Sequence, residues 1–290
     1  MRTKSIKTYL IITFTSLILI ILASSSILFY RTTSREVIDS SKATLLEIAK
    51  SSVKIVESRI DGEFKAVETI VNQDKIKDEI YTLEDKLNFL QDEKERNEYI
   101  TLGIADLEGD LYTTEGEVTN INDRVYFQEA IKSGRGISDP IVSRLNNSLN
   151  IFFAVPIKEN NNISGVLVAI KDGNELSSIV EDITLGESGK AFMINKEGTT
   201  IAHKDRDLVL NMDNDFENVK ENPSLESLVE LEKLMVEGET DSGTYSYNGE
   251  DKSIGYAPVP STGWSIGIEI LKSEVLENLT KIRMQSIIIT

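Results

Sequence analysis

Residues 101–112 read TLGIADLEGDLY, and residues 191–201 read AFMINKEGTTI. Both stretches consist of an apolar run, a polar turn that ends in glycine, and a second run, which is the pattern of two strands joined by a tight turn. The two turns lie 89 residues apart, with Gly109 matching Gly198. This repetition predicts two similar modules in tandem, each built on an antiparallel sheet.

Further strands extend both modules. Residues 150–157 and 163–170 are predicted strands of the first module, and a short helix over 124–132 precedes them. In the second module, the counterpart of the strand that begins at Gly165 is a strand that begins at Gly263. The counterpart of Pro156 is either Pro258 or Pro260. A helix over 176–183 joins the modules. This mixture of helices and antiparallel strands predicts the α+β class.

A long helix is predicted before the first sheet, followed by a charged stretch over 75–97 that is a solvated helix or a loop. Between residues 31 and 71, apolar residues recur at steps of three, four or seven, as on one face of a helix. At 1.5 Å per residue this stalk is about 60 Å long. Its apolar stripe must pack against its own domain or a second copy, and we expect a parallel homodimer through it. The stripe consists of Ile38, Leu45, Ala49, Val53, Val56, Ile60, Phe64, Val67 and Val71.

An apolar segment, TYLIITFTSLILIILASSSILFY, precedes the stalk and holds no charged residue from 8 to 30. A bilayer is crossed by about 20 apolar residues, and Arg2, Lys4 and Lys7 favour a cytoplasmic N-terminus. A cleaved signal peptide is the alternative interpretation, with a weak cleavage signal at 23–26. A last helix over 272–283 leads into the apolar residues 285–290, which indicate the start of a second span or, alternatively, a frayed tail.

These features divide the chain into six expected segments. They are a cytoplasmic N-terminus (1–8), a transmembrane helix (9–30), the stalk helix (31–72), a membrane-distal module (73–185), a membrane-proximal module (186–270), and a return helix with the start of a second span (271–290). Residues 31–283 are then expected outside the cytoplasm, anchored in the plasma membrane.

Composition excludes several classes of function. The net charge is −17, which disfavours nucleic-acid binding, since nucleic-acid binders carry basic surfaces. The chain has no cysteine and one histidine, so disulfides, thiolate catalysis and paired-imidazole metal sites are excluded. We expect no metal and no cofactor.

Five strings together resemble the double Cache sensor of bacterial transmembrane receptors. They are NDRVYFQEAIKSGRGISDPIVSR (122–144), IFFAVPI (151–157), GVLVAI (165–170), GESGKAFMINKEGTTIAH (186–203) and GYAPVPSTGWSIGIEI (255–270). The resemblance implies a long helix carrying two tandem PAS-like antiparallel-sheet modules between membrane spans. It is greatest to methyl-accepting chemotaxis receptors of clostridial type, which implies chemotaxis signalling proteins as partners of a cytoplasmic part. Histidine kinases and diguanylate cyclases carry the same sensor, so those outputs stay open.

The resemblance also implies a ligand site in the distal module. In the amino-acid-binding subset an Arg grips the ligand carboxylate and two aromatic residues follow it, and Arg124, Tyr126 and Phe127 match these positions. One aromatic residue of the pair is expected to pack on the sheet instead. The next loop lacks the Tyr of that pattern and supplies Asp139, Ser143 and Arg144 instead, although Asp139 before Pro140 also suits a turn. The acid expected at a strand end is replaced by Ile170, or lies two residues on at Asp172, so an amino acid, an organic acid or another small polar molecule fits the pattern.

Two other classes of function compete with a sensor. An extracytoplasmic carboxylate hydrolase is disfavoured because no acid pair and no nucleophile–base set stands at a recognisable spacing. A structural or adhesive surface protein would leave the Arg–aromatic pattern without a role. We therefore predict a non-enzymatic small-molecule sensor.

Overall fold

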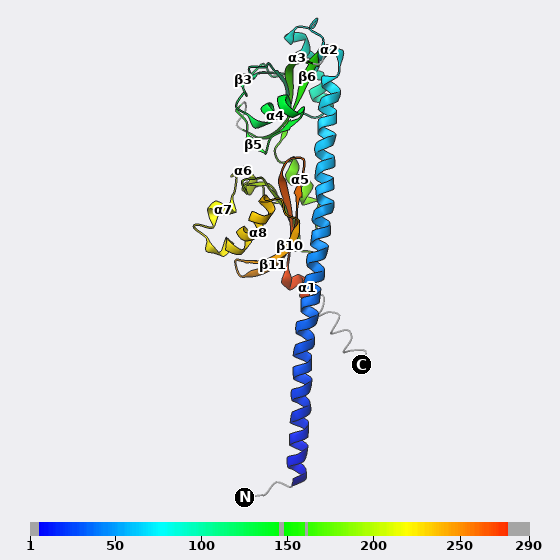
Figure 1. Cartoon of the computed structure of the whole chain (residues 1–290), viewed down its shortest axis with the longest axis vertical. Helices are drawn as coiled ribbons and strands as arrows, with labels where there is room; N and C mark the ends of the chain where they lie inside the picture. The colour runs from blue at the N-terminus through cyan, green and yellow to red at the C-terminus, as the bar shows by residue number, and fades with distance from the viewer. Residues whose placement is uncertain (1–5, 145–147, 160–161, 278–290) are drawn as a thin grey trace.

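One long helix and two antiparallel sheets make up the computed structural model, which describes residues 6–144, 148–159 and 162–277. The helix α1 runs without a break from Ile6 to Val71. The two modules are stacked along one side of its C-terminal half, and its N-terminal part stands clear of them (Figure 1). The predicted α+β architecture is confirmed. The flanking membrane spans stay a prediction.

The N-terminal part of α1 is the apolar segment of the sequence. Within the described residues, one helix, running from Tyr9 to Val71, is long and apolar enough to cross a membrane. No residue of its most apolar 18-residue stretch is buried. Such a helix near an N-terminus fits a membrane anchor and a signal sequence equally. The expected start of a second span, 285–290, lies outside the described residues.

The apolar stripe of the stalk packs within its own chain. Its side chains from Leu45 to Val71 are buried in a core shared with one face of each sheet, so they need no second copy to cover them. The expectation that the stripe itself forms a dimer interface is therefore wrong. Ile55 lies on the opposite face and is 49% exposed.

The charged stretch after the stalk forms two helices. They are α2, Asp74–Lys77, and α3, Leu83–Arg96, and the second begins at a capping box in which Thr82 and Asp85 each bond to the backbone of the other. Of the charged side chains of α3, Glu93 is buried, Lys86 and Lys94 are half-buried, and the others are exposed. The prediction of a solvated helix is confirmed for 83–96.

The distal sheet has the strand order β3-β2-β1-β7-β6-β4, with β5 paired to β6, and every pairing is antiparallel. Helix α4, Val125–Ser133, lies on the face opposite α1. The strands are β1 Thr101–Ala105, β2 Asp110–Thr113, β3 Val118–Asn120, β4 Gly136–Ile137, β5 Ile141–Val142, β6 Leu149–Glu159 and β7 Asn162–Asp172.

The proximal sheet has the order β10-β11-β12-β8-β9 and follows the connecting helix α5, Glu175–Glu181. Three short helices and α8 cover its face opposite α1 (Figure 1). Its strands are β8 Lys190–Ile194, β9 Thr200–His203, β10 Asp241–Tyr247, β11 Glu250–Val259 and β12 Trp264–Leu271. The covering helices are α6 Arg206–Leu210, α7 Asp215–Asn218, the 3-10 helix Pro223–Leu225 and α8 Glu226–Val236. Residues 272–277 are helical and begin the expected return helix.

The two sheets repeat the same order, since β2-β1-β7-β6 corresponds to β9-β8-β12-β11. The turns that carried the prediction are equivalent, and both need glycine because Gly109 has φ +89° and Gly198 has φ +79°. Pro156 pairs with Val166, and Pro258 pairs with Ser265.

The strand register shows which residues of the proximal module correspond to Pro156 and Gly165. Ala105 pairs with Val166, and Ile194, 89 residues after Ala105, pairs with Ser265. Val166 therefore corresponds to Ser265, and Pro258 rather than Pro260 is the counterpart of Pro156. The expected match of Gly165 to Gly263 is wrong by one residue, because the actual partner is Trp264.

Candidate functional site

A cavity of about 480 Å³ lies where the two modules meet, and we call it the junction cavity. Three of the seven predicted site residues line it: Arg124, Tyr126 and Asp139. The other four, Phe127, Ser143, Arg144 and Asp172, do not. Its complete lining is Asp123, Arg124, Val125, Tyr126, Glu129, Ile137, Ser138, Asp139, Ile141, Lys196, Glu197, Pro260, Ser261, Thr262, Gly263 and Trp264.

Arg124 stands at the start of α4. It is the N-cap residue, with φ −81° and ψ 129°, and its backbone carbonyl accepts hydrogen bonds from the backbone N–H groups of Phe127 and Gln128 at 3.1 and 3.2 Å. Its half-buried side chain makes no hydrogen bond or ion pair with the described residues. The fork of the guanidinium is therefore open to a ligand, and such a fork suits a carboxylate.

Tyr126 and Phe127 separate because neighbouring residues of a helix point about 100° apart. Tyr126 lines the cavity while its ring stacks on Phe152, with ring centroids 5.0 Å apart and planes at 13°. Burial raises the pKa of the Tyr126 phenol above its usual range, so it stays protonated at neutral pH and can donate a hydrogen bond. Phe127 is 1% exposed and belongs to the core between α4 and the sheet, as expected for one of the pair.

Asp139 joins the two modules. Its carboxylate accepts hydrogen bonds from Asn195 Nδ2 at 2.8 Å and from Trp264 Nε1 at 2.5 Å, and both partners belong to the proximal module. Arg124 and Trp264 thus line the same cavity from different modules. A ligand there would contact both sides of the junction.

The remaining loop candidates already have partners. Both guanidinium nitrogens of Arg144 donate to the Asp123 carboxylate, at 2.9 and 2.6 Å, and Nη1 also donates to the backbone carbonyl of Asn120. The backbone N–H of the buried Ser143 donates to the carbonyl of Ser148 at 2.8 Å. Arg144 thus links its loop to residues 120–123, and neither Arg144 nor Ser143 lines the junction cavity.

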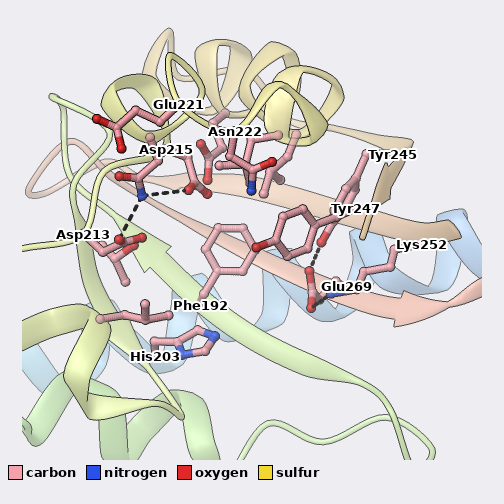
Figure 2. A pocket seen from close by; sticks show the side chains of 16 residues that line it. Phe192, His203, Asp213, Asp215, Glu221, Asn222, Tyr245, Tyr247, Lys252 and Glu269 are labelled. Carbon is pink, nitrogen blue, oxygen red and sulfur yellow. Dashed lines mark hydrogen bonds and ion pairs between the residues drawn. The ribbon is translucent and has the colours of Figure 1, made fainter. Parts of the chain in front are cut away.

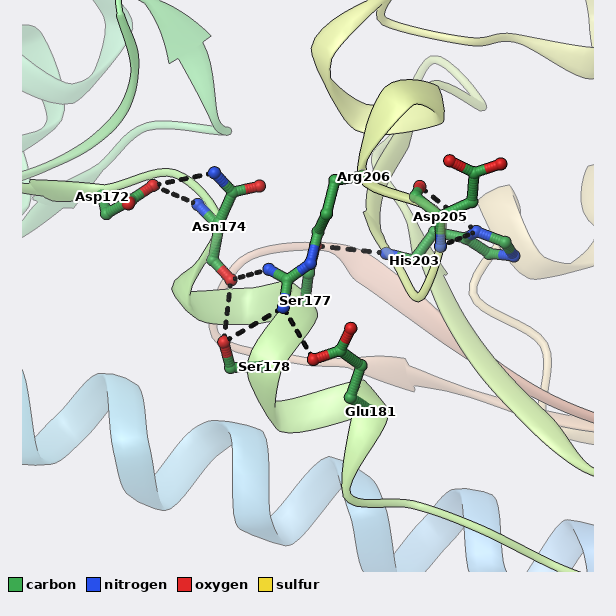
Figure 3. Close-up of polar contacts among 8 residues, drawn as sticks. All are labelled: Asp172, Asn174, Ser177, Ser178, Glu181, His203, Asp205 and Arg206. Atoms are coloured by element: carbon green, nitrogen blue, oxygen red, sulfur yellow. Dashed lines mark hydrogen bonds and ion pairs between the residues drawn. The ribbon is translucent and has the colours of Figure 1, made fainter.

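Asp172 is turned into the connection between the modules (Figure 3). It accepts hydrogen bonds from the backbone N–H and side-chain amide of Asn174, at 2.8 and 3.0 Å. Arg206 then binds α5 by donating to the Asn174 carbonyl and to Glu181 Oε2, both at 2.7 Å. Ile170, which stands where the resemblance implies an acid, is buried in the core under α4.

The junction cavity has charges of both signs. Arg124 and Lys196 are its cationic residues, and its acidic residues are Asp123, Glu129, Asp139 and Glu197. Cations and carboxylates on the same wall suit a small molecule that carries both an anionic and a cationic group. Sequence reasoning missed the seven lining residues at 196–197 and 260–264.

A second cavity, of about 430 Å³, lies inside the proximal module between its sheet and the helices α7 and α8 (Figure 2). Sequence reasoning missed it. The available signal was Glu232, a carboxylate that interrupts the apolar stripe of Leu228, Val229 and Met235 on one helix face. His203, the single histidine of the chain, lines this cavity, and burial lowers the pKa of its imidazole.

Comparison with known proteins gives one family. The model of the Cache domain family matches residues 33–279. Two curated relatives are methyl-accepting chemotaxis proteins, McpG of Pseudomonas putida (26% identical over 158 residues) and McpB of Bacillus subtilis (26% over 156 residues). The matches cover 54% and 52% of this chain but only 23% and 20% of those relatives.

Solved structures with the same fold are chemoreceptor sensory domains. The Campylobacter jejuni chemoreceptor Tlp3 with isoleucine bound has a TM-score of 0.64 at 14% identity, covering 84% of this chain and 98% of that one. The Pseudomonas fluorescens chemoreceptor CtaA in complex with L-isoleucine has a TM-score of 0.65 at 17% identity, covering 85% and 98%. At these identities the likeness concerns the fold.

Proposed function

The chain belongs to the Cache domain family, and on that premise we propose that it is the extracytoplasmic sensor of a chemotaxis receptor and has no catalytic activity. Its curated relatives are chemotaxis proteins at least four times longer than the matched region, so the output resides in a part that this chain does not include. Chemotaxis signalling proteins are the proposed partners of that part. A histidine kinase or diguanylate cyclase output is the alternative.

The proposed ligand is a small carboxylate, either an amino acid or an organic acid, bound in the junction cavity. The observation that carries this proposal is Arg124, whose guanidinium lines the cavity without a partner among the described residues. Tyr126 would supply a phenolic donor and an aromatic wall. The neighbouring carboxylates accommodate an α-ammonium group, and related folds were solved with isoleucine and asparagine.

The proposed signal travels along β12. Trp264, at the start of this strand, lines the junction cavity, and Leu271 at its end directly precedes the helical residues 272–277. Glu274 anchors that helix by accepting hydrogen bonds from the backbone N–H groups of Glu187 and Ser188, both at 2.8 Å. A ligand that favours one arrangement of Asp139 and Trp264 would bias this helix, by no more than its difference in affinity for the two arrangements.

The proposed topology has residues 9–30 in the plasma membrane and residues 31–283 outside the cytoplasm. The basic residues before the apolar segment support this orientation. The division into modules at 73–185 and 186–270 is part of the same proposal, and each part contains one of the two sheets.

The test of ligand binding uses Trp264, the single tryptophan of the chain. We expect an amino acid or organic acid from a screened panel to change the Trp264 fluorescence of the purified chain and to raise its melting temperature. A ligand at 100 times its Kd stabilises the folded state by about 2.7 kcal/mol, which for a domain of this size is a shift of about 5–10 °C. A panel of carboxylates with no effect on fluorescence or melting would contradict the proposal.

A homodimer in the membrane is also proposed, through the exposed face of α1. Ser51, Ile55 and Ser58 lie on this face at helical spacing, and all three are exposed in the single chain. Since the chain has no cysteine, single Cys variants at Ser51 and Ser58 report the contact directly. We expect both to form disulfide-linked dimers in membranes, whereas Cys at the buried Leu45 should not. No cross-link at either exposed position would exclude a dimer through this face.

A further inference from the structure

The cavity in the proximal module, which we call the proximal cavity, has a floor of sheet and a roof of helices (Figure 2). Its volume of about 430 Å³ lies in the range of small-molecule sites. Side chains from all five strands of the proximal sheet and from the helical segments between α6 and α8 line it.

One equivalent position of the two sheets illustrates the difference from the distal module. Thr101 pairs with Ile170, and the equivalent Lys190, 89 residues later, pairs with Glu269. Ile170 fills an apolar core beneath α4, whereas Glu269 lines a cavity beneath α8. The same site in the fold is therefore packed in one module and hollow and acidic in the other.

The lining of the proximal cavity carries an excess of negative charge. Five carboxyl groups face one lysine, and burial lowers the pKa of His203, which disfavours its cationic form. Lys252 is already paired with Glu269 at 2.8 Å, and Glu269 also accepts a hydrogen bond from the Tyr245 hydroxyl. The five are Asp213, Asp215, Glu221, Glu232 and Glu269.

Two of these five acids, Asp213 and Asp215, share a single hydrogen-bond donor. The side-chain amide of Asn218 donates to Asp213 Oδ1 at 2.9 Å and to Asp215 Oδ1 at 3.4 Å. One neutral amide leaves the charge of both carboxylates uncompensated. This wall therefore attracts a cation.

Glu232 on α8 is the second, independent observation. It is 3% exposed, and its Oε2 atom has no hydrogen-bond partner among the described residues. Burial, followed by the charges of Asp215, Asp213 and Glu269, raises the pKa of the Glu232 carboxyl to about 9. An unsatisfied buried polar group destabilises the fold, and a ligand that donates to Oε2 would remove this cost.

We propose that the proximal cavity is a second ligand site, which binds a small organic cation through a protonated amine held by Glu232 and the Asp213–Asp215 pair. The rings of Phe192 and Tyr247 line the same cavity and offer contacts to the carbon chain and to the cation. Among the described residues no three acids or histidines are placed to hold a metal ion, which favours an organic cation over Ca²⁺. The site is separate from the junction cavity and does not depend on Arg124.

The test is calorimetric titration of the full chain in nanodiscs of neutral lipid. The probes are putrescine, butylammonium, the neutral 1,4-butanediol and the dianion succinate. We expect the two amines to bind and the diol and succinate not to bind in this cavity. Absence of binding by both amines would overturn the proposal.

Two glutamate variants separate this site from nonspecific attraction to an acidic protein. Glu232→Gln should weaken amine binding at least tenfold and should fold normally, because the buried carboxyl is already neutral at pH 7. Glu230→Gln removes a full negative charge from the same helix at an exposed position outside the cavity, which is a larger change of net charge than Glu232→Gln makes at pH 7, and it should bind as the wild type does. Equal affinity in the two variants would overturn the proposal.

Release of a proton on ligand binding distinguishes a direct contact by Glu232 from a purely structural role, which would release none. A bound cation favours the ionised carboxylate, so binding at pH 7 should release a proton from Glu232, and affinity should rise between pH 7 and pH 9. Titrations in buffers of different ionisation enthalpy measure the release, which should vanish in Glu232→Gln. The other titratable groups that line the cavity with Glu232 are Asp213, Asp215, Glu221, Glu269, Lys252, His203, Tyr245 and Tyr247. Amine binding without proton release would exclude Glu232 as the contact.

Discussion

Replacing Arg124 by alanine is expected to weaken binding of the carboxylate ligand by about 2–5 kcal/mol, the range for removing one partner of a desolvated charge pair. This is about 30-fold to several thousand-fold in Kd. The guanidinium holds no other residue in place, so the fold should survive and the loss should be specific to binding. Titration followed by Trp264 fluorescence measures the loss at the junction cavity itself.

Two further variants define what Arg124 contributes. Arg124→Lys keeps the charge but not the planar fork, and it should lose most of the affinity as well. Lys132→Ala removes a positive charge from an exposed position on the same helix and should bind normally. Full affinity in Arg124→Ala would move the carboxylate site away from the junction cavity and contradict the proposed ligand chemistry.

The regular elements of this fold could be predicted from the sequence, because each is fixed by a local period. The stripe from Leu45 to Val71 identified one long helix, and the glycine turns at Gly109 and Gly198 identified two equivalent sheets. The surface against which the stripe packs could not be predicted, because an apolar helix face indicates burial but does not identify the partner surface. The structure buries it against its own sheets, so the proposed dimer needs the opposite face.

The candidate site was only half accessible to sequence reasoning. Arg124 and Tyr126 follow from a local pattern, and both reach the junction cavity. The bond from Asp139 to Trp264 joins residues 125 positions apart, so no local pattern predicts it. Arg144 was misplaced for a similar reason, since its partner Asp123 lies 21 residues before it in another loop.

The proximal cavity could not be predicted from the pattern of arginine and aromatic residues, because its lining does not contain that pattern. The relevant feature was instead a violation of a period, a glutamate at a buried position of α8. A buried acid without a partner destabilises the fold, so its presence in an apolar stripe indicates a site.

The Gly255→Ala substitution is expected to lower the stability of the fold by about 1–3 kcal/mol, the usual cost of overpacking. A Cβ at residue 255 would lie 2.3 Å from the backbone nitrogen of Leu46, so β11 and α1 would have to separate. Gly62→Ala is the matched control, because a Cβ there meets nothing within 4 Å and alanine should stabilise the helix interior by about 0.5–1 kcal/mol. Thermal melting of both variants should therefore shift in opposite directions, and an unchanged melting temperature in Gly255→Ala would contradict close packing of α1 on the proximal sheet. Gly255 pairs with Ile268 on β12, the strand that leads to residues 272–277, so Gly255→Ala should also weaken transmission of a ligand signal along β12.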